Sequence, residues 1–122
     1  MTNDEAGQSQ VIAILSEDSL YRRTHPSFKK NGKVSTAIFK QRNPHLSVDV
    51  AKLTTPECCL AGYQNHGLAG ILAGFVRQLS LNAYHEPLPD NYAHGIVEGK
   101  ITDAIAKKLV LSADLIVEPE SV

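Results

Sequence analysis

Three short segments of the sequence carry residue types that could bind or transform a ligand. The first is LYRRTHP at 20–26, where Arg22 and Arg23 are adjacent and His25 follows. A guanidinium presents a rigid fork of N–H donors that suits a phosphate or a carboxylate. On a strand the two arginines point to opposite faces, so one can enter a pocket while the other stays in solvent. The alternative is that both are surface arginines paired with acidic neighbours.

The second segment is LSVD at 46–49, in which apolar and polar residues alternate. On a strand, Ser47 and Asp49 therefore share one face, opposite Leu46 and Val48. That face is either the floor of a polar cleft or the solvent side of a sheet. No G-x-S-x-G elbow surrounds Ser47, so the sequence does not support a hydrolase nucleophile at this position.

The third segment is PDNYAH at 89–94, which follows an earlier proline at Pro87. Prolines lower the entropy cost of holding a loop in one conformation. The side chain of Asn91 can cap backbone groups in a turn. His94 can act as a general acid or base near neutral pH. The alternative is a structural turn next to a buried, hydrogen-bonded histidine.

Together the three segments predict one polar cleft for an anionic, nucleotide-like small molecule. The expected ligand-binding residues are Arg22, Arg23, His25, Ser47 and Asn91. His94 and Asp49 are the expected catalytic residues, with a proton moved by one of them. The alternative is a non-catalytic protein-interaction module of a multi-component bacterial system, in which these residues only form turns. The sequence leaves open whether the protein is an enzyme.

Charge and length limit the class of protein. The chain has 122 residues, 12 Lys+Arg against 13 Asp+Glu, and a net charge of −1. This balance excludes a strongly basic nucleic-acid coat protein, and no nucleic-acid partner is expected. The length fits a single domain, and 43% of the residues are hydrophobic, which is ordinary for a globular protein. A homo-oligomer or another protein partner stays open.

The sequence predicts neither a cofactor nor a metal. There is no G-x-G-x-x-G, no G-K-[ST] and no H-E-x-x-H motif. The five histidines, at 25, 45, 66, 85 and 94, show no i, i+3 or i, i+4 spacing. Cys58 and Cys59 are adjacent and are expected to be free thiols on a helix, one buried and one near the surface.

The N-terminal residues, the length of the apolar runs and the cysteines together indicate the cellular compartment. Its first ten residues have neither the basic nor the apolar region of a signal peptide. No apolar run approaches the ~20 residues of a membrane span. Free thiols fit a reducing environment. We therefore expect a cytoplasmic protein with no membrane contact.

Periodicity and capping residues predict short elements that would position the three segments. Strands are expected at 20–24, 45–50, 81–85, 94–97 and 115–117. Two helices begin with a threonine N-cap. One starts at Thr55-Pro56 and runs to about Tyr63, and the other starts at Thr102 and runs to about Ala113.

The stretch 67–79 has two interpretations. Its apolar residues follow an i, i+3, i+4, i+7 pattern, which predicts an amphipathic helix. Glycines at 67, 70 and 74 favour the alternative, a strand that allows close backbone approach. Residues 67–75 would be either core or a dimer face.

Because short strands do not alternate regularly with helices, the expected fold is α+β rather than a doubly wound parallel sheet. It would be a single small domain at 11–117, with a short, mostly antiparallel sheet and two or three helices. Residues 1–10 are expected to be a disordered leader. Residues 118–122 are expected to be a tail.

Four motifs carry a resemblance to small bacterial proteins of unknown function. They are L-Y-R-R-x-H-P (20–26), S-x-x-x-F (35–39), L-S-V-D (46–49) and P-D-N-x-A-H (89–94). The resemblance covers about residues 20–117 and implies no activity.

A weaker similarity is to ADP-ribosyltransferase-like folds, which place an arginine or histidine early, a serine on a middle strand and an acidic residue late. This similarity implies Arg22 or Arg23 for the first position and Ser47 for the second. The third position holds Asn91 and His94 here, and Glu98 lies farther on.

Overall fold

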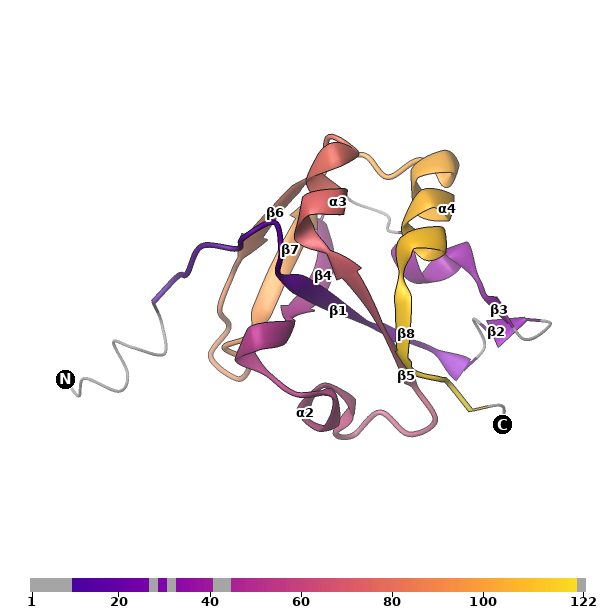
Figure 1. Cartoon of the computed structure of the whole chain (residues 1–122). Coiled ribbons are helices and arrows are strands. Elements are labelled where there is room, and N and C mark those ends of the chain that lie inside the picture. Colours follow the sequence, from indigo (N-terminus) through magenta and orange to yellow (C-terminus); the bar gives the residue numbers. More distant parts are fainter. Residues whose placement is uncertain (1–9, 27–28, 31–32, 41–44, 121–122) are drawn as a thin grey trace.

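The computed structural model describes residues 10–26, 29–30, 33–40 and 45–120. These residues form the predicted α+β fold, with a six-stranded antiparallel sheet in the order β6-β7-β4-β1-β5-β8 (Figure 1). The leader expected at 1–10, apart from Gln10, and positions 121–122 of the expected tail lie outside the described residues.

The six strands of the main sheet are β1 (Ser19–Thr24), β4 (His45–Val50), β5 (Gly67–Leu72), β6 (Asn82–His85), β7 (His94–Glu98) and β8 (Asp114–Val117). A second sheet pairs β2 (Lys29–Lys30) with β3 (Lys33–Val34). The helices are α2 (Pro56–Leu60), α3 (Ala73–Gln78) and α4 (Asp103–Ser112), with 3-10 turns η2 (Thr36–Phe39) and η3 (Ala51–Leu53).

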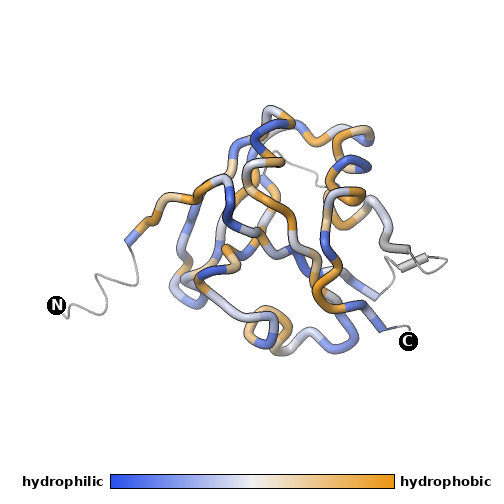
Figure 2. The backbone as a smooth tube through the Cα atoms, viewed as in Figure 1, coloured by the Kyte–Doolittle hydropathy of each residue, from blue (hydrophilic) through white to orange (hydrophobic). Residues whose placement is uncertain are grey.

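The core lies on one face of the sheet, beneath α3, α4 and η2, whereas α2 lies at the other face (Figure 1). Strand residues alternate between faces, so Leu46, Val48 and Val50 all enter the core from β4. Hydrophobic and hydrophilic residues alternate along α4 in Figure 2, as expected of a helix with one buried side. The buried side of α4 carries Ala106 and Leu109.

The two predicted helix starts are confirmed. The Thr55 hydroxyl accepts a hydrogen bond from the Cys58 N–H at 3.2 Å, and Thr102 caps α4 in the same way. The predicted end of the first helix near Tyr63 is wrong, because α2 stops at Leu60. Gly62 follows with a φ of 80°, which an α-helix does not accommodate.

The amphipathic helix predicted over 67–79 is wrong for its first half. Gly67–Leu72 is strand β5, and a helix begins only at Ala73. A Cβ atom on Gly67 would lie 2.4 Å from the Val117 carbonyl oxygen, so the strand needs glycine there. The alternative interpretation, a strand with close backbone approach, is therefore the correct one for β5.

Among the described residues, no helix has the length and apolar character needed to cross a membrane. Pro119, beyond β8, is fully buried, and the Glu120 N–H donates to the Asn65 carbonyl at 3.0 Å. The chain thus stays packed against the domain after its last strand.

Candidate functional site

A pocket opens where two neighbouring strands separate. β1 and β4 pair only at Leu20↔Val50 and Tyr21↔Asp49. Beyond that point β1 continues along β5 and β4 continues along β7, so the two strands diverge. The pocket between them has a volume of about 40 Å³. Pockets for whole drug-sized ligands measure ~300–1,000 Å³, so this one has room for a single small group.

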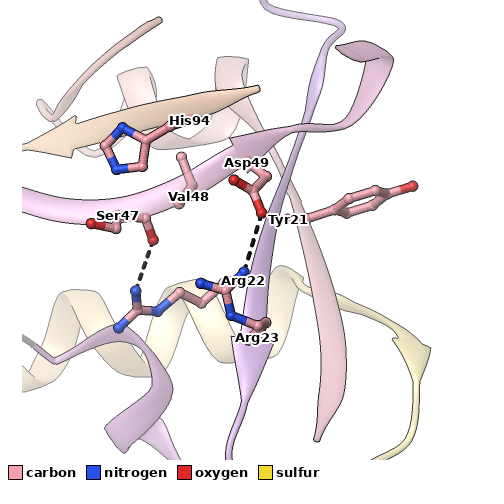
Figure 3. Close-up of a pocket in the computed structure, with 7 residues that line it drawn as sticks. All are labelled: Tyr21, Arg22, Arg23, Ser47, Val48, Asp49 and His94. Atoms are coloured by element: carbon pink, nitrogen blue, oxygen red, sulfur yellow. Dashed lines mark hydrogen bonds and ion pairs between the residues drawn. The ribbon is translucent and has the colours of Figure 1, made fainter. Parts of the chain in front are cut away.

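The structure brings five of the seven predicted site residues together at this pocket. The seven residues that line it are Tyr21, Arg22, Arg23, Ser47, Val48, Asp49 and His94 (Figure 3). Asn91 does not line it but contacts Asp49 from the neighbouring loop. His25 is exposed just after β1. Its ring packs against the His66 ring in a T-shaped arrangement, with the ring centres 5.0 Å apart.

Arg22 bridges the separated strands. Its Nε donates to the Ile38 carbonyl at 2.8 Å. Its Nη1 donates to the Ser47 carbonyl at 2.7 Å (Figure 3). Among the described residues no carboxylate pairs with Arg22. Burial, and secondarily the charge of Arg23, lowers the pKa of the Arg22 guanidinium, which nevertheless stays charged. Within the described part of the chain, the pocket therefore contains a cation whose hydrogen-bond partners are neutral.

Arg23 lies on the opposite side of β1 and is held by three different groups. Its Nη1 lies 3.4 Å from the Asp49 Oδ2 and donates to the Cys59 carbonyl at 3.3 Å. Its guanidinium carbon lies 4.2 Å from the centre of the Tyr63 ring, a cation–π geometry. The side chain is still 33% exposed, so a ligand could reach it.

Asp49 is the only carboxylate in the lining, and both its oxygens are engaged. Oδ1 accepts from the Asn91 amide at 2.8 Å, and Oδ2 faces Arg23. The Asn91 Oδ1 in turn accepts from the Ala93 N–H at 3.2 Å. Asn91 thus forms the structural turn that the sequence offered as an alternative, and at the same time it orients Asp49.

The two cysteines of α2 are free thiols, with Cys58 exposed and Cys59 buried, which confirms the prediction. Burial, reinforced by the negative charge of Asp49, raises the pKa of the Cys59 thiol to about 11. A thiol with this pKa is protonated at neutral pH and is a poor nucleophile. The Cys59 side chain therefore fills space beside the site and does not act as a nucleophile.

His94 is held by its Nδ1, which lies 2.9 Å from the Glu86 carbonyl oxygen. A carbonyl only accepts hydrogen bonds, so Nδ1 carries the proton and Nε2 of the neutral ring is an acceptor. The ring is 12% exposed and lies on the Ser47 side of the pocket (Figure 3). Its Nε2 is thus suited to exchange a proton with a group bound there.

Sequence reasoning missed two of the lining residues, Tyr21 and Val48. Tyr21 had a usable signal, because it lies two residues from Arg23 and shares its face of β1. Val48 points to the core and lines the pocket only because the strands separate beside it.

Comparisons of the chain with protein-family models, curated proteins and solved structures find no match. Among the described residues, no group of three or more His, Cys, Asp or Glu side chains could hold a metal ion. A functional assignment therefore has to rest on the charges and hydrogen bonds of the pocket itself.

Proposed function

We propose that the protein binds a small anionic, nucleotide-like molecule, with one phosphate-sized group in the pocket between β1 and β4. The observation that carries this proposal is the charge of the lining. Two guanidinium groups face one carboxylate, and that carboxylate is paired with Arg23. Arg22 is left with two carbonyl partners. Arg22 is half-buried, so its charge has lost part of its hydration, and a bound anion would compensate that loss.

The rest of the ligand would lie on the open sheet face beside Tyr21. One edge of this ring lies beside Gly70, since a Cβ placed on that glycine would be 3.7 Å from the tyrosine Cδ1. Ile116, on the other side of Gly70, is 44% exposed. An aromatic and an aliphatic side chain beside an anion pocket suit a planar base joined to a phosphate.

His94 is the better candidate of the two predicted catalytic residues. Its Nε2 is an acceptor in the neutral ring, whereas both oxygens of Asp49 already accept hydrogen bonds or face a cation. In the proposed complex His94 takes a proton from the ligand, or donates one to it when protonated. Asp49 orients Arg23. The free thiols fit a reducing cytoplasm, which we propose as the compartment.

A thermal-shift and calorimetric series tests the proposal. Inorganic phosphate and adenosine monophosphate are expected to stabilise the wild type, by about 2.7 kcal/mol at a hundred times the dissociation constant. Adenosine, which lacks the anion, is expected to bind far more weakly. Arg23→Gln and Ser47→Ala should weaken binding of the monophosphate by about tenfold, equivalent to one lost hydrogen bond.

His45→Ala is the matched control. His45 lies on the same face of β4 as Ser47 and Asp49 but does not line the pocket. Its Nε2 lies 2.8 Å from the Glu98 Oε2. It should leave monophosphate binding unchanged. A folded wild type that binds neither phosphate nor the monophosphate would overturn the proposal. So would equal losses in Arg23→Gln and His45→Ala.

The second candidate function, a non-catalytic interaction module, is favoured by the β8 edge. Within the described part of the chain β8 pairs only with β5, and its Leu115 and Ile116 are 43% and 44% exposed. Exposed apolar edge strands are common protein contacts. Analytical ultracentrifugation tests self-association through this edge. A wild-type dimer that Ile116→Lys converts to a monomer would support this function. A wild-type monomer at all concentrations would argue against self-association.

A further inference from the structure

The chain before β1 is tied to the domain by side chains. Residues 10–15, which we call the arm, are in neither a helix nor a strand. Five side chains form hydrogen bonds with main-chain atoms of the arm. Three of them donate to carbonyls: Tyr92 to Gln10 (2.8 Å), Lys52 to Ala13 (3.5 Å) and Arg77 to Ile14 (2.6 Å). The other two accept from N–H groups: His85 from Ile12 (3.0 Å) and Asp18 from Leu15 (2.7 Å). Five separate contacts to main-chain atoms fix the path of the arm.

We infer that His85, one of these five residues, is a positioning residue for the pocket, because it clamps together the arm and the loop at 86–93. His85 is 3% exposed and both its ring nitrogens are used. Nδ1 accepts from the Ile12 N–H at 3.0 Å, and Nε2 donates to the Tyr92 carbonyl at 2.6 Å. The Ile12 N–H thereby selects the Nε2-protonated tautomer that the loop requires.

The loop in turn holds two ionisable groups of the pocket, Asp49 and His94. Its Asn91 donates to the Asp49 carboxylate at 2.8 Å, and its Glu86 carbonyl accepts from the His94 Nδ1 at 2.9 Å. The hydrogen bond from His85 to the Tyr92 carbonyl joins the two ends of the loop, and the same imidazole ring contacts the arm. The contacts therefore run without a gap from the arm, through His85 and the loop, to the pocket.

The inference rests on the proposed function for its effect on binding, but not for its effect on His94. The main chain of Glu86 is also held by its N–H, which donates to the His94 carbonyl at 2.9 Å. Loosening the loop at Tyr92 therefore shifts the Glu86 carbonyl rather than releasing it, and the carbonyl then fixes the proton on the His94 Nδ1 less strictly. Both tautomers of His94 are then populated, and the fraction with an accepting Nε2 falls. Anion binding weakens because Asp49 and Arg23 lose their fixed orientation.

Two conservative variants separate the halves of the clamp. The amide of glutamine reaches about as far as Nε2, so His85→Gln keeps a donor for the Tyr92 carbonyl. The amide of asparagine reaches only about as far as Nδ1, so His85→Asn keeps an acceptor for the Ile12 N–H and loses the loop bond. Both variants lose the T-shaped contact with the Tyr92 ring, whose centre lies 4.9 Å from that of the His85 ring. They therefore differ from each other only in the loop bond and in one methylene group.

The expected result is a difference between these variants. His85→Asn should bind inorganic phosphate about tenfold more weakly than wild type, and His85→Gln within about twofold. Ring-nitrogen NMR should show the Nδ1-protonated tautomer of His94 in wild type and His85→Gln, and a mixture in His85→Asn. Equal losses in both variants, or an unchanged His94 tautomer in His85→Asn, would overturn the inference.

Two further measurements keep the test decisive. If His85→Asn does not fold, Tyr92→Phe removes only the hydroxyl bond to Gln10. It should speed hydrogen exchange of the Ile12 amide and shift the His94 tautomer slightly, and no change in either would contradict the clamp. If the wild type binds no phosphate, the proposed function fails, while the His94 tautomer still decides the role of His85.

Discussion

The two faces of the sheet are built from the same strands but are held together by different forces. On β4, Leu46, Val48 and Val50 enter the core, and Ser47 and Asp49 face the pocket. The core face gains its stability from apolar area removed from water. The pocket face has polar groups whose positions are set by particular hydrogen bonds. Substitutions on the two faces should therefore affect stability and binding separately.

Arg22 shows how the two faces communicate. By alternation it belongs to the core face with Leu20 and Thr24, both fully buried. Its guanidinium nevertheless lines the pocket, because β1 and β4 pair over only two residue pairs before they diverge. A separation within a sheet thus lets a residue from the core side contribute charge to the other side.

The largest effect on stability is expected on the core face, at Phe39, which is fully buried. Phe39→Ala removes a large side chain and leaves a cavity, so the free energy of unfolding should fall by about 3–5 kcal/mol. Ser47→Ala on the pocket face should change it by less than ~0.5 kcal/mol. Urea unfolding of both variants measures this difference. Equal losses would show that the two faces are not energetically separate.

Much of the fold could be predicted because its signals are local. Period-two alternation marked β4, and threonine followed by proline marked the start of α2. The failure at β5 has a physical cause. Its apolar residues are buried on both faces, Ile71 in the core and Leu68 on the side where α2 lies. A strand buried on both sides has no alternation, and its apolar run fits a helix equally well.

The site was predictable as residue types but not as an arrangement. Arginine, serine, aspartate and histidine each suggest chemistry from the sequence alone. The divergence of β1 from β4, however, depends on the pairing of each strand with a different neighbour, which is not local information. The role inferred for His85 had no sequence signal, because its partners at Ile12 and Tyr92 are recognised only once the chain has folded.

A smaller effect on stability is expected where the loop meets the pocket, at Asn91. Asn91→Ala leaves a buried carboxylate oxygen of Asp49 and the Ala93 N–H without their partner. We expect a loss of about 1–3 kcal/mol in the free energy of unfolding, together with weaker phosphate binding. Thermal unfolding and calorimetry measure the two quantities on one sample.

Asn82→Ala is the control for Asn91→Ala. Asn82 is exposed, and among the described residues its side chain accepts from the adjacent Ala83 N–H at 2.9 Å. Its removal should cost less than ~0.5 kcal/mol and leave binding unchanged. If Asn91→Ala behaved like this control, the loop would not support the pocket.

The smallest effect is expected outside both faces, at the ion pair before β1. The Lys52 Nζ lies 2.7 Å from the Asp18 Oδ2, and this bond is the main cause that lowers the pKa of Asp18 below its usual 3.8. A carboxyl with a lowered pKa in the folded state adds stability above the unfolded value, and this contribution is lost as the pH falls through the folded pKa. At neutral pH, Asp18→Asn should therefore cost no more than about 1 kcal/mol, and less in high salt.

Urea unfolding of wild type and Asp18→Asn at several pH values measures this contribution. The two proteins should differ at pH 7 and converge below the pKa of Asp18, where the wild-type carboxyl is protonated and no longer attracts Lys52. A constant difference at all pH values would mean that the effect of Asp18→Asn does not come from the charge of Asp18. That outcome would leave Arg23–Asp49 as the ion pair whose charge matters to the domain.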